Sequence, residues 1–148
     1  MAEEESVIAI TVNIKSNKSR MRIHHIGLYC VDLEAMRAFF MRHFGCSSNE
    51  QYHNPRTGLR TYILTPNDGG CTIEIMSRPE VTAFRQEPYR SGYIHLSFSV
   101  GSKEAVDQIT RELEDEGCAC TSGPRTTGDG FYESQIVGPE GILIEVTV

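Results

Sequence analysis

Two histidines and two glutamates recur at matching places in the two halves of this sequence. His25 and Glu74 are separated by 49 residues, and His95 and Glu145 by 50, and each lies in a short apolar stretch with strand character. Two imidazoles and two carboxylates that meet at one point suit a borderline divalent metal ion, and they leave coordination positions for water or substrate oxygens. The spacing therefore predicts a catalytic metal site, provided that the fold brings these residues together.

Each of these residues also has an ordinary interpretation. A single histidine is more often a hydrogen-bonded core or surface residue than a ligand, and an acid at a strand edge is usually solvated. However, an unpaired glutamate buried between isoleucine neighbours is costly, as it would be at Glu74. Four such residues at repeated positions favour one shared cause over four coincidences.

Strand alternation predicts which side of each strand carries these residues. Successive side chains point to opposite faces, and in each stretch one alternating set is apolar and suited to cover a helix. The alternation selects His25 over His24 for the other face. The residues expected on the ligand-bearing faces are His25, Gly27, Tyr29, Thr72, Glu74, Met76, His95, Ser97, Ser99, Leu143, Glu145 and Thr147. We expect all four candidate ligands on one concave face.

Helices are expected directly after the two histidine-bearing strands. Asp32 is a good N-cap before apolar residues at helical spacing, and Gly45 ends this pattern. Ser102 and Gly117 bound a similar pattern in the second half. Further strands are expected over 51–60, 62–65 and 71–76 in the first half and over 118–121, 131–137 and 142–148 in the second. The glycine-rich stretch 122–130 is expected as a loop, and within it 123–130 is the best candidate for a mobile lid.

Composition limits the kinds of partner that the chain could bind. The 148 residues carry a formal net charge of −6, with 14 Lys and Arg against 20 Asp and Glu. This balance argues against a nucleic-acid or anionic-membrane surface. The partner we expect is a small-molecule substrate. The acidic start Met-Ala-Glu-Glu-Glu is unlike a signal peptide, and five cysteines at irregular spacing suit reduced thiols. We therefore expect a cytoplasmic protein.

The domain organisation follows from the repeat. Residues 1–20 are expected to be an appendage that could add an edge strand or cross to a partner subunit, and Met21 is an alternative start of the chain. Residues 21–148 form one domain, in which a polar linker at about 80–91 separates a first module at about 21–79 from a second at about 92–148.

The motifs around the four residues carry a family resemblance. The segments His25-Ile-Gly-Leu-Tyr-Cys-Val-Asp-Leu-Glu, Thr72-Ile-Glu-Ile, Ile94-His-Leu-Ser-Phe-Ser-Val and Gly138-Pro-Glu-Gly-Ile-Leu-Ile-Glu resemble those of the vicinal oxygen chelate superfamily, in particular its glyoxalase I-like members. This glyoxalase, bleomycin resistance protein and dioxygenase family implies an α+β fold. Its two tandem βαβββ modules form curled mixed sheets with a metal-binding concave face.

The resemblance also implies a site and an assembly. It implies that His25, Glu74, His95 and Glu145 bind one divalent metal, for which Zn, Ni or Co is favoured and Mn or Fe is an alternative. A further alternative is that Glu74 lies next to the site without binding the metal. A homodimer is implied, since the family often builds each site from one chain's first module and the other chain's second. The sequence leaves open whether the site is swapped in this way or lies within one chain.

The activity implied is that of a metal-dependent lyase or isomerase of the lactoylglutathione lyase type. A proton would move on a carbon next to a carbonyl through a metal-bound enediolate, with Glu145 or Glu74 as the proton carrier and the resemblance favouring Glu145. Glutathione is not expected as part of the substrate. Tyr29 stands where glutathione-dependent members have an arginine, and the segment 76–79 lacks their asparagine.

Substrate contacts and competing functions complete the expectations. Candidate contacts are three arginines expected in loops, which could equally be solvated, and three aromatic walls: Arg56, Arg60, Arg125, Tyr29, Phe131 and Tyr132. The alternative function is a non-catalytic, drug-binding protein of the bleomycin resistance type, which needs no metal. A ring-cleaving dioxygenase or a thiol transferase would need only two histidines and one glutamate, so Glu74 favours the glyoxalase-like branch.

Overall fold

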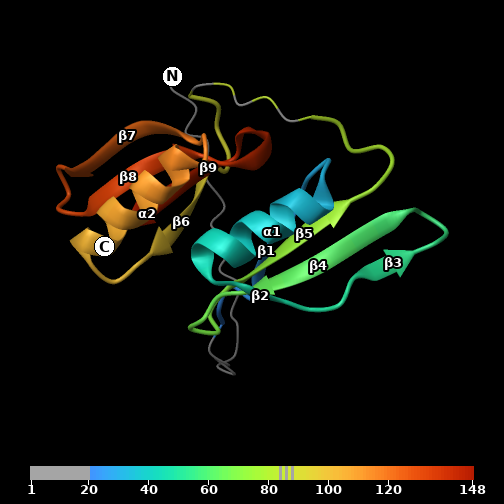
Figure 1. The fold of residues 1–148 in the computed structure, drawn as a ribbon. Coiled ribbons are helices and arrows are strands. Elements are labelled where there is room, and N and C mark those ends of the chain that lie inside the picture. The colour runs from blue at the N-terminus through green and yellow to red at the C-terminus, as the bar shows by residue number, and fades with distance from the viewer. Residues whose placement is uncertain (1–20, 84, 86, 88) are drawn as a thin grey trace, which may run out of the picture.

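The computed structural model describes residues 21–83, 85, 87 and 89–148, so the expected appendage over 1–20 lies outside the described residues. The described chain forms two βαβββ-type modules (Figure 1). The first contains β1 (His25–Tyr29), α1 (Leu33–Phe44), β2 (Ser47–Ser48), β3 (Tyr52–Asn54), β4 (Leu59–Thr65) and β5 (Thr72–Ser77). The second contains β6 (His95–Ser99), α2 (Lys103–Asp115), β7 (Ala119–Thr126), β8 (Tyr132–Val137), the 3₁₀ turn η1 (Pro139–Gly141) and β9 (Leu143–Thr147). The predicted fold class is confirmed.

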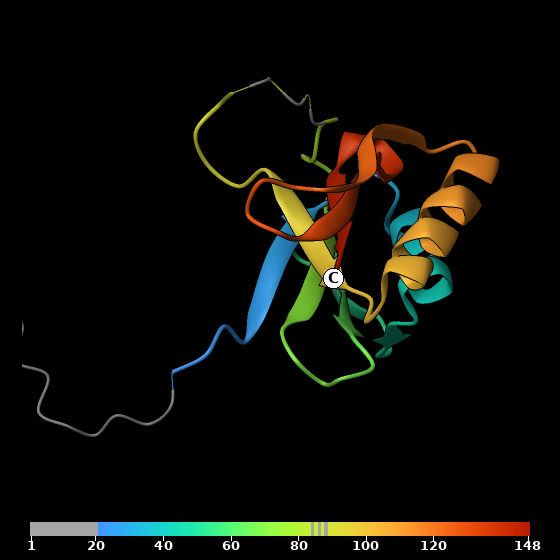
Figure 2. The ribbon, with the colours of Figure 1, turned by 90° about the vertical axis from the view of Figure 1, so that its left-hand side faces the viewer.

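Each module has one mixed sheet with the same strand arrangement. The orders are β1-β5-β4-β2, with β3 also on β4, and β6-β9-β8-β7. The first strand of each module pairs in parallel with the last, and the other pairs are antiparallel. Parallel pairing of adjacent β1 and β5 requires a crossover, which α1 and the intervening strands provide. Both helices lie on the same side of the molecule, as Figure 2 shows, and leave the opposite faces of the sheets open.

The helix boundaries follow the expected capping chemistry. The Asp32 carboxylate accepts a hydrogen bond from the backbone N–H of Ala35, and Gly45 ends α1 at a φ of 62°. A left-handed conformation favours glycine, because a Cβ is disfavoured there. The Ser102 hydroxyl caps α2 in the same way, through the N–H of Ala105. These caps fix where each helix starts relative to its histidine-bearing strand.

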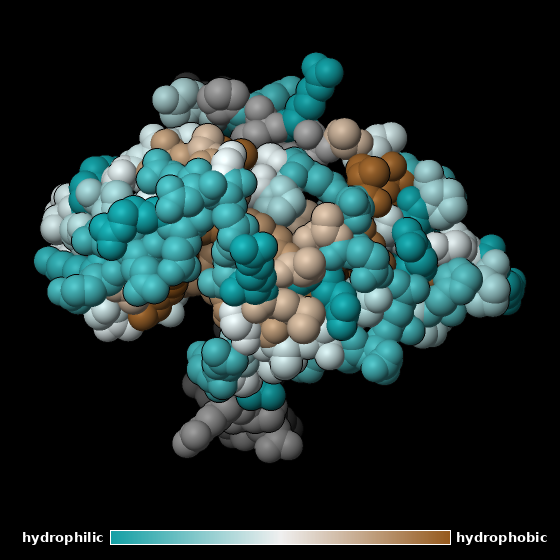
Figure 3. Space-filling model, viewed as in Figure 1, coloured by the Kyte–Doolittle hydropathy of each residue, from teal (hydrophilic) through white to brown (hydrophobic). Residues whose placement is uncertain are grey.

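The two modules contact each other on the helix side. Phe44 of α1 stacks on Phe98 of β6 with ring centroids 4.2 Å apart. The Glu140 carboxylate, in η1, accepts hydrogen bonds from the backbone N–H groups of Val31 and Asp32 at the start of α1. Figure 3 shows more hydrophobic residues in the middle of this face, where the modules meet, and hydrophilic residues over most of its flanks.

The strand β7 corrects one prediction. The segment 122–126, expected within a loop, belongs to β7, and only the turn around 127–130 remains outside the strands. The β7–β8 register shifts between Cys120 and Ser122 and between Ser122 and Arg125, and Gly123 has a φ of 79°. The Gly-Pro pair that indicated a loop therefore marks an irregularity within a paired strand. The short strand β2 was not predicted.

Two further structural findings bear on the expectations about environment. All five cysteines are free thiols, as predicted. Within the described part of the chain, neither helix has the length and hydrophobicity needed to cross a membrane.

Candidate metal site on the open sheet faces

The structure brings the four predicted ligands together as two pairs, one in each module. His25 Nε2 lies 3.6 Å from Glu74 Oε2, and His95 Nε2 lies 3.5 Å from Glu145 Oε2. Strand register explains both pairs: Gly27 lies opposite Glu74 in β1–β5, and Ser97 lies opposite Glu145 in β6–β9. Each histidine is thus two residues before the position opposite its glutamate. The histidine and the glutamate of each pair belong to the sheet face that points away from the helices, as strand alternation predicts.

The donor atoms of each pair fit a divalent metal ion. The Nε2-to-carboxylate distances of 3.5–3.6 Å exceed the roughly 2.7–3.2 Å of an N–H···O hydrogen bond. Two ligand atoms that are each about 2.1 Å from one ion lie roughly 3–3.6 Å apart. His25 Nδ1 lies 2.9 Å from His24 Nδ1, and when His25 is the donor its Nε2 carries the lone pair that a metal needs. Each His–Glu pair therefore suits the predicted divalent metal ion.

The two pairs are not joined into one cluster. Among the described residues, no group of three or more His, Cys, Asp or Glu side chains lies close enough to hold a metal ion. One chain in this conformation thus presents two incomplete halves, which we call the first half-site (His25 and Glu74) and the second half-site (His95 and Glu145).

The second half-site is more enclosed and more tightly held. The Ser97 hydroxyl donates a 2.6 Å hydrogen bond to Glu145 Oε1, which leaves Oε2 facing His95. The side chain of Glu145 is 18% exposed, against 27% for Glu74. In the first module, Gly27 lies opposite Glu74 and offers no hydroxyl. A carboxylate fixed through one oxygen is better oriented for proton transfer through the other.

The open face of the second sheet carries a third carboxylate that the sequence did not single out. Gln135 lies opposite Glu145, and Glu133 lies opposite Thr147 on one side and Arg125 on the other. Burial, followed by the nearby charges of Glu145 and Asp129, raises the pKa of Glu133, against smaller opposing effects of Arg125 and His95. The signal that could have found Glu133 is its alternation with Ser134 and Ile136, which are buried.

The predicted substrate contacts divide between the two sides of the sheets. Tyr29 and Phe131 are about half exposed, and Tyr29 lies on the open face of its strand. Arg125 is in β7, opposite Glu133, rather than in a loop as expected. Arg56 lies in the turn between β3 and β4. These four residues remain candidates for contact with a substrate.

Arg60 and Tyr132 lie on the other side, which corrects two expectations. Arg60 is in β4 rather than in a loop, and it lies opposite the buried Ser77 on the helix-covered face. Tyr132 donates a hydrogen bond of 2.7 Å to Asp107 of α2. Both residues are one position out of phase with the open face, so neither can form a wall of the open-face site.

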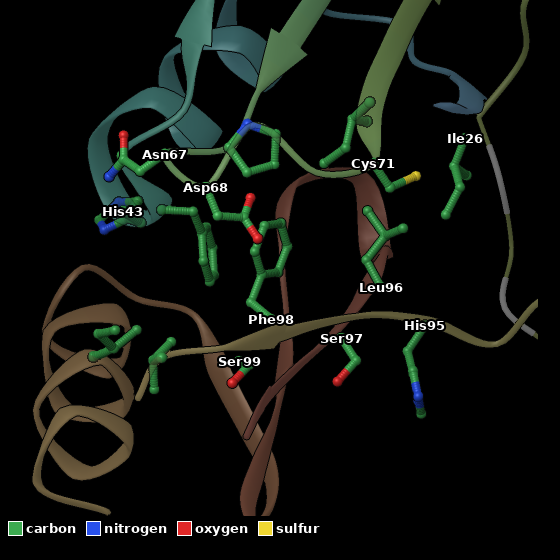
Figure 4. Close-up of a pocket in the computed structure, with 16 residues that line it drawn as sticks. Ile26, His43, Asn67, Asp68, Cys71, His95, Leu96, Ser97, Phe98 and Ser99 are labelled. Atoms are coloured by element: carbon green, nitrogen blue, oxygen red, sulfur yellow. The ribbon is translucent and has the colours of Figure 1, made fainter. Parts of the chain in front are cut away.

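A cleft of about 680 Å³ lies between the modules on the helix side. Figure 4 shows Leu96 and Phe98 of β6 pointing into it, while His95, Ser97 and Ser99 point away. Ile26 and Phe44 of the first module also line it. His95, Ser97 and Ser99 also border this cleft, but their side chains point away from it, so the second half-site opens on the other side of β6.

Comparison with known proteins gives a consistent result. Residues 22–146 match the model of the Glyoxalase/Bleomycin resistance protein/Dioxygenase superfamily. The Bacillus subtilis protein YwkD, described as uncharacterized, is 32% identical over 95 residues, which cover 64% of this chain and 71% of YwkD.

Two solved structures share the fold at low sequence identity. Leishmania major glyoxalase I, described as trypanothione-dependent, has a TM-score of 0.67 and 18% identity over 85% of each chain. The Listeria monocytogenes fosfomycin resistance protein FosX, in complex with Mn(II) and sulfate, has a TM-score of 0.64 and 18% identity. That match covers 84% of this chain and 88% of FosX.

Proposed function

This chain belongs to the Glyoxalase/Bleomycin resistance protein/Dioxygenase superfamily, and we propose that it is a metal-dependent lyase or isomerase that moves a proton on a carbon next to a carbonyl. The observation that carries the proposal is the duplicated His–Glu pair, with its donor atoms 3.5–3.6 Å apart in both modules. His25, Glu74, His95 and Glu145 would hold one divalent ion. The Mn(II) in FosX is in keeping with an ion in this fold.

We propose that the two half-sites are completed across a homodimer. Support comes from the separation of the half-sites among the described residues of one chain. In a two-fold symmetric dimer, the first half-site of each chain can meet the second half-site of its partner, which yields two equivalent sites. Each site would then contain two imidazoles and two carboxylates.

The protein side chains have distinct tasks in the proposed reaction. A divalent ion, when bound, would supply positive charge that stabilises negative charge on two neighbouring substrate oxygens. Glu145, when its Oε2 is not bound to the ion, takes the proton from the carbon next to the carbonyl and returns it to the neighbouring carbon, so the reaction needs no oxidant or reductant. Ser97 holds one oxygen of Glu145 and keeps the other directed to the open face. Tyr29 and Phe131, at the edges of the site, limit the access of water to it.

Metal analysis of protein purified without a chelating column tests this function. We expect about one divalent ion per chain, lost in His25→Ala and in His95→Ala, because either change removes one of about four ligands. His53→Ala is the matched control, since His53 is exposed on β3, away from both half-sites. No bound metal in the wild type, with unchanged stability in both variants, would contradict the proposal.

Mixing the two variants tests the assembly across chains. A dimer of one His25→Ala chain and one His95→Ala chain contains one intact site if the half-sites are shared between chains. Random re-pairing should then restore about a quarter of the wild-type metal content. No recovery despite mixed dimers would place all four ligands within one chain.

A non-catalytic binding protein is the second candidate. The cleft between the modules favours it, because apolar residues such as Leu96 and Phe98 line a volume suited to a small molecule. Such a protein would bind its ligand without metal, so the metal analysis separates the two candidates.

A further inference from the structure

We propose that Glu133 is a specificity-determining residue of the open-face site, and that it selects substrates carrying a hydrogen-bond donor, a hydroxyl or an ammonium, over substrates carrying a carboxylate. The inference rests on the proposed function, because it takes the site of Glu145 and His95 as the place where a substrate binds. It concerns a residue that the duplicated ligand pattern does not include.

The position of Glu133 follows from the strand register. Glu133 lies opposite Thr147 in β8–β9, and Thr147 is two residues beyond Glu145 on the same face. Diagonal neighbours of this kind on one face are about 7–8 Å apart, within reach of long side chains. A substrate group bound beside Glu145 can therefore extend to Glu133.

The carboxylate of Glu133 has no partner of its own among the described residues. It takes part in no hydrogen bond or ion pair there, although Arg125 lies directly opposite on β7. The Arg125 Nε instead donates a hydrogen bond to the hydroxyl of Ser122. A partly buried, unpaired carboxylate next to a second carboxylate is unfavourable, so Glu133 gains free energy from any donor brought to it.

The neighbouring atoms also favour a donor-bearing ligand. Thr147 Oγ1 is buried and has no hydrogen-bond partner among the described residues. It lies between Glu133 and the second half-site on the same face, so a ligand that displaces its cover can pair with it. The carboxylates of Glu133 and Glu145 repel a carboxylate and attract a hydroxyl or an ammonium, and the opposing positive charge of Arg125 has the smaller effect on Glu133.

Hydroxamates of one size provide the probes. Propanohydroxamates that carry a hydrogen, a hydroxyl, an ammonium or a carboxylate on the terminal carbon are titrated into the full-length protein loaded with Co(II). Binding is followed in the visible spectrum of the cobalt ion. We expect the hydroxyl and ammonium probes to bind about tenfold more tightly than the hydrogen probe, and the carboxylate probe to bind more weakly.

Variants assign the preference to Glu133. Glu133→Gln removes the charge but keeps one acceptor oxygen, so we expect the ammonium preference to fall about tenfold and the hydroxyl preference to change less. Glu133→Leu should abolish both preferences. Glu114→Gln, which removes the same charge from the exposed side of α2, should change neither. The unfolding temperature of each variant checks that the fold is intact.

The possible outcomes distinguish a failure of this inference from a failure of the proposed function on which it rests. Equal binding of all four probes, or a preference that persists in Glu133→Leu, overturns the role of Glu133 and leaves the metal site standing. No cobalt spectrum, or no response to the hydrogen probe, overturns the metal site and with it this inference. A hydroxyl preference without an ammonium preference in the wild type identifies a neutral polar substrate class.

Discussion

The two modules share a topology but differ in how firmly they hold their half-sites. In the second module, Ser97 fixes Glu145 through a 2.6 Å hydrogen bond, and the imidazole of His95 is 29% exposed. In the first, Gly27 occupies the position equivalent to Ser97, and the imidazole of His25 is 45% exposed. The same ligand pair is thus oriented in one module and loosely held in the other. A repeated fold can place equivalent residues in unequal roles.

The buried cores beneath the two helices also differ between the modules. Phe40 of α1 and Leu64 of β4 are both fully buried. The residue 70 positions after Phe40 is Thr110, and its hydroxyl lies 2.6 Å from that of Ser134; both residues are also buried. At this place on the buried side of its helix, the first module therefore packs an aromatic ring, and the second has two hydroxyls that bind each other.

The largest expected effect sharpens the comparison of the half-sites. Glu145→Gln should lower turnover by about 10²–10⁴-fold, because an amide cannot accept the transferred proton. Glu74→Gln should also lower turnover by orders of magnitude at limiting metal but recover partly in excess metal, since Glu74 acts through the ion. The measurement is the conversion, followed by NMR, of hemithioacetals of methylglyoxal with several small thiols into the isomeric 2-hydroxy thioesters. Full turnover by Glu145→Gln would exclude it as the base.

A second prediction concerns the apolar core of the first module. Phe40→Ala should lower the free energy of unfolding by about 3–5 kcal/mol, because it removes a buried ring that packs beside Phe39, Phe44 and Phe98. Denaturant unfolding measures the loss.

The counterpart in the second module provides the control. Thr110→Val keeps the side-chain volume but leaves Ser134 without its partner, which should cost about 1–3 kcal/mol. Adding Ser134→Ala to Thr110→Val should recover part of this loss. Equal losses for Phe40→Ala and Thr110→Val would contradict the contrast between the two cores.

Much of the site could be predicted because strand alternation has a fixed period of two. The choice of His25 over His24, and the pairing of each histidine with a glutamate, required only this period and the repeat. The same period would have placed Arg60 and Tyr132 on the helix side, because Tyr62, Leu64, Ser134 and Ile136 are core residues. Gly123 and Pro124 concealed the extent of β7, since local composition does not reveal an irregular pairing.

The separation of the half-sites could not be predicted. It depends on how one module packs against the other, through contacts such as Phe44 with Phe98 and Glu140 with the start of α1. These contacts join residues far apart in the sequence and follow no local period. The sequence therefore predicts what each module presents, while the relative placement of the modules requires the structure.

The last prediction concerns the buried thiol of the first module, Cys30, which the second module replaces with Val100. Cys30 is 1% exposed, and burial, followed by the charges of Glu140 and Asp32, raises its pKa from 9.0 to about 12. Above pH 9 the unfolded chain releases this proton and the folded chain retains it until about pH 12, so stability falls as pH rises through this window. Between pH 8 and about pH 10.5, the wild type should lose about 2 kcal/mol more than Cys30→Ala does. Parallel loss in the two proteins, measured by urea unfolding under reducing conditions, would show that Cys30 ionises as readily in the folded chain as in the unfolded one.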